Sequence, residues 1–278
     1  MEPEYSIADQ PARFARAKSA NDARVLDIDS VYDGSRFRNL RVLVTGANRG
    51  IGLALTRELL SQGARVFASV RKPGQELAGL KSGSDGLLII DGVDVTEDAA
   101  VAKLAREVPE PLDVVINNAG YFYEPLETLA NLNFAEELRM IDICALGPLR
   151  VTAALHDAGR IREGGKVAMI TSQGGSITWR TTQNPEGHDY GHHMSKAAAN
   201  MMSVLLAQEL RGAGISVSVL HPGFNKTDMT RKYASIWEAE GAVDVSVGAR
   251  RVLHEISRQS LETSGRFINC EDGLQIPW

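Results

Sequence analysis

Residues 41–52 read RVLVTGANRGIG, and this stretch decides the fold. A short apolar run, Arg41–Thr45, has the length and valine content of a buried strand. Three glycines, Gly46, Gly50 and Gly52, follow it before a helical pattern begins. Glycines at such a turn let the backbone approach a pyrophosphate, and the start of a helix presents unpaired N–H groups to its charge. A glycine turn can be purely structural, but a position directly between a strand and a helix favours dinucleotide binding.

On both sides of this turn, short apolar runs alternate with longer helical patterns. The predicted strands are Arg41–Thr45, Arg65–Val70, Leu87–Asp91, Asp113–Asn117, Lys166–Thr171, Ser216–Leu220 and Arg266–Asn269. The predicted helices cover 51–62, 97–107, 134–158, 192–212 and 245–259. This alternation predicts a single α/β Rossmann-type domain, with a doubly wound parallel sheet of about seven strands and helices on both faces.

Residues 1–40 do not follow this alternation, so we predict an N-terminal arm before a domain that covers residues 41–278. A short helix near 11–24 is expected, followed by a loop. Phe14, Val25, Leu26 and Val31 are apolar and favour an arm packed on the domain surface. A flexible leader is the alternative.

Composition narrows the class of protein. The 278 residues carry a net charge of −5 with no basic stripe, which argues against a nucleic-acid partner. No apolar run approaches the roughly 20 residues that cross a bilayer, and the acidic start does not resemble a secretory signal. The two cysteines, Cys144 and Cys270, lie in apolar patterned segments, which predicts buried thiols and a cytoplasmic protein.

Charge after the second predicted strand indicates which dinucleotide binds. An NAD enzyme usually offers a carboxylate there to the ribose 2′-hydroxyl. This chain has Arg71 and Lys72 instead, with no acid before Glu76, and Arg49 adds a second guanidinium in the glycine turn. Because a guanidinium binds phosphate oxygens in a bidentate manner, the pair favours the 2′-phosphate of NADP(H).

From Arg41 to Trp278 the sequence resembles the short-chain dehydrogenase/reductase family. The matching motifs are the glycine turn, the segment Asp94–Thr96, an NNAG motif at Asn117–Gly120, a PG…TDM segment from Pro222 to Met229, and a tail similar to that of the C-factor-like subgroup. The resemblance and the charge pattern together predict a cofactor site made of Gly46, Asn48, Arg49, Gly50, Ile51, Gly52, Arg71, Asp94, Val95, Asn118, Ala119, Gly120, Lys196, Pro222, Gly223 and Thr227.

The resemblance also implies a catalytic set, which this chain matches only in part. Ser172 matches the serine that orients the substrate oxygen, and Lys196 matches the lysine that binds the nicotinamide ribose. His192 stands where the family has its proton-transferring tyrosine, and Cys144 stands at the asparagine that holds a relay water. We therefore predict Ser172, His192 and Lys196 as the catalytic residues of an atypical active site.

Tyr190 is a poor substitute for the missing tyrosine. Residues four apart share a helix face, whereas six apart point about 240° around the axis. Tyr190 therefore faces away from Lys196 if the helix has begun there.

His192 can be read in two ways. Its unperturbed pKa of about 6.5 suits proton transfer, but the imidazole reaches roughly 2 Å less far than a tyrosine hydroxyl. The charge of Lys196 favours the neutral imidazole and cofactor phosphates favour the charged one. His192 is either a proton donor or orienting donor, or a side chain that fills the space of the lost tyrosine.

We predict no metal site, although His188, His192 and His193 are close in sequence. The segment Asn184–Gly187 indicates that His188 precedes the helix, and no further ligand lies nearby.

These observations predict an NADP(H)-dependent oxidoreductase that transfers hydride to a carbonyl or imine of a small organic molecule. Two alternatives remain: chemistry that needs no tyrosine, such as iminium reduction, cyclisation or elimination, and a non-catalytic NADP(H)-binding sensor or scaffold. The substrate is expected to lie between Tyr121–Tyr123, the 173–191 loop and a lid near 229–243. By resemblance we expect a homodimer or homotetramer, with Met202, Leu206 and Leu210 as part of the contact.

Overall fold

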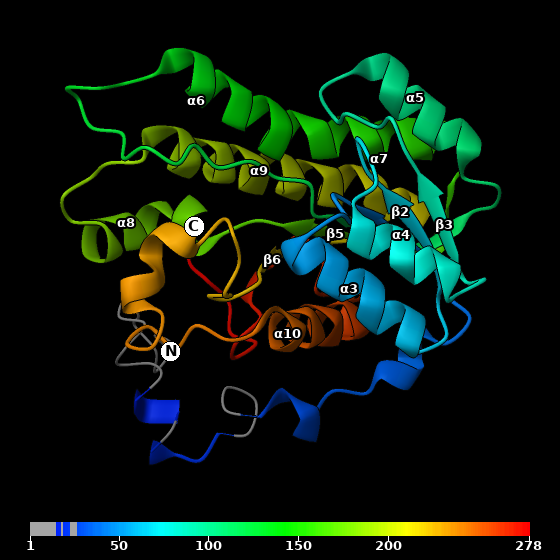
Figure 1. Cartoon of the computed structure of the whole chain (residues 1–278), viewed down its shortest axis with the longest axis horizontal. Coiled ribbons are helices and arrows are strands. Elements are labelled where there is room, and N and C mark those ends of the chain that lie inside the picture. Colours follow the sequence, from blue (N-terminus) through cyan, green and yellow to red (C-terminus); the bar gives the residue numbers. More distant parts are fainter. Residues whose placement is uncertain (1–14, 18, 23–26) are drawn as a thin grey trace.

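The computed structural model describes residues 15–17, 19–22 and 27–278, and its centre is a seven-stranded parallel sheet (Figure 1). The strand order is β3-β2-β1-β4-β5-β6-β7, so the predicted doubly wound fold is confirmed. The strands are β1 (Arg41–Thr45), β2 (Arg65–Ser69), β3 (Leu87–Ile90), β4 (Leu112–Asn117), β5 (Ile161–Ile170), β6 (Ser216–His221) and β7 (Phe267–Asn269).

Helices cover both faces of the sheet (Figure 1). On one face α3 (Gly50–Ser61), α4 (Gln75–Ser82) and α10 (Val245–Arg258) cover one apolar core, and on the other α5 (Asp98–Glu107), α7 (Gly147–Asp157) and α9 (Tyr190–Glu209) cover a second. The helix α6 (Phe134–Ile141) packs on α9 and leads into α7 through a π-helical segment, η3 (Asp142–Leu146). The remaining elements are the helix α8 (Ile177–Gln183) and the 3-10 segments η1 (Ile28–Ser30), η2 (Gly34–Phe37), η4 (Gln173–Gly175), η5 (Leu210–Ala213) and η6 (Arg231–Ile236).

The strand order reverses direction at β1 and β4, and this point positions the site. β1 leads to the strands on one side and β4 to those on the other, which is the arrangement that opens a crevice at the carboxyl ends of the strands. Gly46 and Asn118 directly follow the two strands. The glycine turn and the NNAG motif therefore meet at this crevice.

Part of the predicted arm packs on the domain. Ile28 and Phe37 are buried, η1 and η2 contact α10, and Asp29 pairs with Arg250 at 2.6 Å. Val31 is 42% exposed, so its predicted burial is wrong. Phe14, Val25 and Leu26 lie outside the described residues; of the helix predicted near 11–24, residues 15–17 and 19 are described as helical.

The predicted contact face of α9 is also wrong. Leu206 is buried and, with Met202 and Leu210, packs in the core between α9 and the sheet. The outward apolar residues of α9 are Met194, Met201 and Leu205. Within the described part of the chain, no helix is both long and apolar enough to span a membrane.

Candidate active site

The glycine turn is built for close backbone approach. Gly46 and Gly50 have φ of +65° and +54°, a left-handed conformation that side chains with a β-carbon rarely adopt. A β-carbon on Gly52 would overlap the backbone oxygen of Gly46 and lie 2.5 Å from the side-chain nitrogen of Asn118. The start of α3 therefore sits directly against the end of β1.

Side chains and backbone from β4 fix this turn. Thr45 Oγ1 accepts hydrogen bonds of 3.0 Å from the backbone N–H groups of Asn118 and Ala119. The Asn118 amide donates to the backbone oxygen of Thr45 at 3.0 Å. Asn48 Oδ1 accepts from the backbone N–H of Gly74 at 2.5 Å, which ties the turn to the segment after β2. The side chains of Asn118 and Asn48 thus stabilise the conformation of the turn.

The start of α3 fits an anion. Arg49 is the N-cap residue and its side chain forms no capping hydrogen bond, so no side chain closes the helix end at Gly50 and Ile51. Thr227 comes close from the other side, with its methyl carbon 3.7 Å from the β-position of Gly50. The start of α3 is therefore an uncapped helix N-terminus, which is the kind of site that binds a pyrophosphate.

A cavity of about 470 Å³ lies beside the turn, between the segment after β3 and the helices α6 and η3. Arg71, Asp94 and Thr96 line one side, and Leu138 and Arg139 line the other. Asp94 accepts hydrogen bonds from the backbone and hydroxyl of Thr96 at 3.0 and 2.8 Å. Two residues predicted for the cofactor site, Arg71 and Asp94, therefore share one cavity.

Three further residues of the predicted cofactor site, Val95, Pro222 and Gly223, are buried. Val95 is buried, and its Cγ2 is 2.7 Å from the β-position of Gly147. Pro222 and Gly223 are buried at the end of β6. Gly223 has φ of +81°, and a β-carbon there would lie 2.6 Å from Cγ of Glu271. Close packing alone accounts for glycine at position 223.

Ser172 and His192 meet at Gly174. A β-carbon on Gly174 would lie 3.2 Å from both Ser172 Oγ and His192 Nε2, so the two polar atoms flank one small space. Ser172 comes from the end of β5 and caps η4 by accepting the Gly174 N–H at 3.0 Å. His192 comes from the first turn of α9. The structure therefore brings together two residues that are 20 positions apart in the sequence.

The surroundings of His192 favour its neutral form. Burial lowers its pKa well below the ordinary value, and the charge of Lys196 lowers it further. The ring packs edge-on against Phe122, with centroids 4.9 Å apart, and Nδ1 is buried without a hydrogen-bond partner. Among the chain's own residues, burial and the charge of Lys196 thus favour the neutral imidazole.

Lys196 lies one helical turn after His192 on α9. The η4 segment packs closely on this turn, since a β-carbon on Gly175 would lie 2.7 Å from the Lys196 backbone oxygen. Ser172, His192 and Lys196 therefore share one wall of the crevice. Their catalytic roles stay predictions.

His193 lies at the same place, with Nδ1 3.1 Å from the β-position of Gly174. His193 Nδ1 is 3.0 Å from the Gly174 oxygen and Nε2 is 3.0 Å from the Asn184 amide, so an Nδ1–H tautomer satisfies both partners. His188 precedes α9 with φ of +78°. The hydroxyl of Tyr190 is 4.0 Å from the β-position of Gly187, on the loop before the helix.

Cys144 lies in the π-helical segment η3, and π-turns of this kind are frequent at functional sites. Its sulfur accepts from the Tyr121 N–H at 3.5 Å and donates to the Tyr121 oxygen at 3.4 Å. Cys144 and Cys270 are both buried thiols, as predicted.

Sequence reasoning missed three charged residues around His192. Lys232 lies on η6, Arg180 on α8, and Glu127 on the loop after β4. The side chain of Glu127 is buried and accepts from the Gly191 N–H at 2.9 Å. The contacts of Lys232 and Glu127 join segments more than 40 residues apart, and no local pattern in the sequence signals them.

Comparison with known proteins agrees with this geometry. The family model described as short chain dehydrogenase matches residues 41–236. The chain is 34% identical over 240 residues to a 1-hydroxy-2-glutathionyl-2-methyl-3-butene dehydrogenase of Rhodococcus sp. (strain AD45), covering 85% of this chain and 99% of that protein. It is 37% identical over 170 residues to the C-signal protein of Myxococcus xanthus, covering 60% of this chain and 93% of that one.

Solved structures lead to the same family. The NADPH-bound carbonyl reductase from chicken fatty liver is 30% identical, with a TM-score of 0.73 over 87% of this chain and all of that one. The carbonyl reductase Sniffer of Drosophila melanogaster is 25% identical, with a TM-score of 0.75 over the same shares. The chain therefore belongs to the short-chain dehydrogenase family.

Proposed function

We propose that this protein is an NADP(H)-dependent reductase that delivers hydride to a carbonyl or imine of a small organic molecule. The observation that carries the proposal is the meeting of Ser172 Oγ and His192 Nε2 at Gly174. A substrate oxygen beside Gly174 would be within reach of two hydrogen-bond donors. When bound, the nicotinamide cofactor supplies the hydride.

His192 then acts as a neutral donor rather than as a cationic acid. A pKa well below the ordinary value means that the ring carries one proton at neutral pH. We place that proton on Nε2, which faces Ser172. Together the two donors stabilise the negative charge that develops on the substrate oxygen, and such stabilisation is worth about 10²–10³-fold per donor in rate.

The cofactor choice rests on charge. Neither Arg49 nor Arg71 has a carboxylate within ion-pair distance among the described residues. Both are exposed, and Arg71 lines the cavity beside Asp94. Their free guanidinium groups support binding of a 2′-phosphate. The carbonyl reductase from chicken fatty liver also binds NADPH.

A second reaction has one observation in its favour. Reduction of a pre-formed iminium needs no proton transfer to the substrate, and the lowered pKa of His192 leaves no cationic acid on this residue.

We also assign the protein to the cytoplasm and to homo-oligomers. Two buried cysteine thiols support the first assignment.

The experiment that tests the proposal is NADPH oxidation by the purified protein against small ketones, aldehydes and cyclic imines. NADH serves as the matched control cofactor. Turnover of any of these compounds with NADPH supports a reductase. Tight NADPH binding without turnover of any compound would instead favour the non-catalytic sensor or scaffold.

A further inference from the structure

Three cations surround His192. After burial, the largest influences on its pKa are the charges of Lys196, His193, Arg180 and Lys232, and each of them lowers it. They come from three different elements, α9, α8 and η6. The charges that act on His192 itself are therefore positive, while the carboxylates of Glu127 and Asp189 lie beside its first helical turn.

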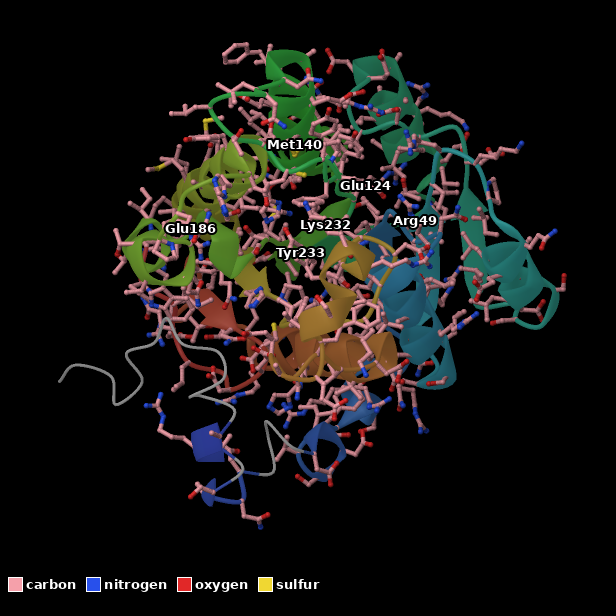
Figure 2. All side chains as sticks on the ribbon, turned by 60° about the vertical axis from the view of Figure 1, so that its left-hand side comes forward. Arg49, Glu124, Met140, Glu186, Lys232 and Tyr233 are labelled. Atoms are coloured by element: carbon pink, nitrogen blue, oxygen red, sulfur yellow. The ribbon has the colours of Figure 1, made fainter. Side chains whose placement is uncertain are left out.

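Lys232 approaches His192 through Phe122. Its Nζ lies 4.0 Å from the centroid of the Phe122 ring, whose edge packs on His192. The ammonium donates one hydrogen bond, of 3.1 Å, to the backbone oxygen of Glu124, and Asp189 Oδ1 lies 3.8 Å away. In Figure 2, Lys232 and Tyr233 are seen beside Glu124.

This geometry leaves donor capacity on Lys232. An ammonium has three N–H groups, and one of them is used in the hydrogen bond to Glu124. Burial lowers the pKa of Lys232, and its side chain is 23% exposed. A partly buried ammonium with unused N–H groups is stabilised by an anion that contacts it directly.

Arg180 adds to the same field without a carboxylate partner. Its guanidinium donates to the backbone oxygens of Ser176 and Gln173 and to the side chain of Gln183, at 3.2, 3.1 and 2.5 Å. Its pKa is lowered by burial alone. Gln173 directly follows Ser172, so this guanidinium lies behind the oxygen-binding side of the pocket.

The family resemblance implies that Lys196 binds the nicotinamide ribose. Lys232 and Arg180 are then the cations that can interact with the substrate. We infer that the substrate carries a carboxylate, which Lys232 binds beside Phe122 while Arg180 strengthens the attraction. The charges of Asp189, Glu124 and Glu127 already offset part of the charge of Lys232, so the site suits a single negative charge better than a doubly charged phosphate. This inference rests on the proposed reductase function and narrows its substrate to keto acids or imino acids.

Binding measured by calorimetry tests the inference independently of turnover. The probes are phenylpyruvate and levulinate, each compared with its own methyl ester, titrated into the protein with NADP⁺ and again without it. We expect each acid to bind at least about tenfold tighter than its ester. Lys232→Met should remove this preference while leaving ester affinity within about twofold, and Lys232→Arg should retain it.

Lys226→Met is the matched control, because Lys226 is an exposed lysine on the same segment. Thermal melting of each variant shows whether it is folded. Equal binding of acid and ester, a Lys232→Met loss shared by both probes, or no binding of either acid would overturn the inference. Failure of the reductase function has a different signature, since acid would still be preferred over ester while NADPH oxidation was absent.

Discussion

The carboxylate of Glu127 accepts a hydrogen bond of 2.9 Å from the backbone N–H of Gly191, one residue before His192. The backbone oxygen of Glu127 also accepts the N–H of Asp189 at 3.0 Å. On the other side of Gly191 lies α6, with Glu137 Cα 3.0 Å from the β-position of this glycine. The first turn of α9 is therefore held from two sides, and two buried acids, Glu127 and Glu137, lie at this junction.

The first prediction concerns these two acids. Burial, followed by the charge of Glu127, raises the pKa of Glu137. An acid with a raised folded-state pKa stabilises the fold below its unfolded pKa, and the contribution is lost as pH rises, because the unfolded chain then releases the proton more readily. Glu137→Gln should therefore increase the melting temperature at neutral pH by roughly 2 °C. The gain should shrink near pH 4.

The control for Glu137 is Glu186→Gln, an exposed acid on the loop before α9. Its melting temperature should follow the unmodified protein at every pH. A Glu137→Gln protein that was less stable at neutral pH would show that the ionised form of Glu137 holds the junction.

The strands were predictable because each is an unbroken apolar run between turn residues. β1 agrees with its prediction at both ends, and most other strands agree within one residue. The exception is β5, which begins at Ile161, whereas the prediction began at Lys166. The added residues include Gly164 and Gly165, and among them Ile161 pairs with Leu112 of β4 before a register shift, so tertiary pairing rather than local preference extends the strand.

The helix predicted over 134–158 is in fact three segments. The π-helical turn η3 separates α6 from α7, and α7 begins at Gly147-Pro148. Pro148 has no backbone N–H to continue the ladder, and Gly147 is pressed against Val95 of another element. Helical periodicity continues through such a turn, so the sequence alone predicted one helix.

The site was predictable only where its residues follow strands. Ser172 and the glycine turn follow β5 and β1, and the carboxyl ends of parallel strands lie at the same edge of the sheet. The approach of Lys232 to Phe122 depends on how η6 folds back over the loop after β4. α8, which carries Arg180, is seven residues long with Ile177 74% exposed, so no apolar face predicts it.

Cofactor selectivity gives the second prediction. Arg71→Ala should weaken NADP(H) binding at least about tenfold, or roughly 1.4 kcal/mol, because a guanidinium contact to the 2′-phosphate is lost. NAD(H) binding should change little. Calorimetric titration with both cofactors measures this, with Lys72→Ala as the exposed neighbouring control. Equal losses of affinity for the two cofactors would show that Arg71 does not bind the 2′-phosphate.

Assembly gives the third prediction. Met201 and Leu205 are 63% and 61% exposed on the outer face of α9, beside α6 with its exposed Phe134 and Leu138. We expect light scattering to report a dimer or tetramer at micromolar concentration. The double substitution Met201→Glu with Leu205→Glu should yield monomers, because charges are excluded from an apolar contact.

The matched control for assembly is Ile177→Glu, which places the same charge on an equally exposed apolar residue of α8. It should leave the assembly unchanged. A monomeric unmodified protein, or a double variant that still assembles, would show that this face of α9 is not the contact.

The last prediction concerns His192, whose role separates the possible reactions. If the neutral ring donates to the substrate oxygen, His192→Ala should lower turnover of a ketone by about 10²–10³-fold, with NADPH affinity within about twofold. Because burial and nearby cations hold its pKa well below the ordinary value, turnover should show no titration near 6.5. A pH profile with a clear inflection there would show that the cationic ring is needed.

His192→Gln and His192→Tyr sharpen this test. Gln keeps a side-chain N–H donor and should recover part of the lost turnover. Tyr restores the family's residue four positions before Lys196, and a gain of ketone reduction would show that Ser172 and Lys196 still support that chemistry. If instead the substrate is a pre-formed iminium, no oxyanion develops, and all three substitutions should cost little beyond packing against Phe122. Rates for a ketone and a cyclic iminium, measured side by side in each variant, distinguish the two reactions.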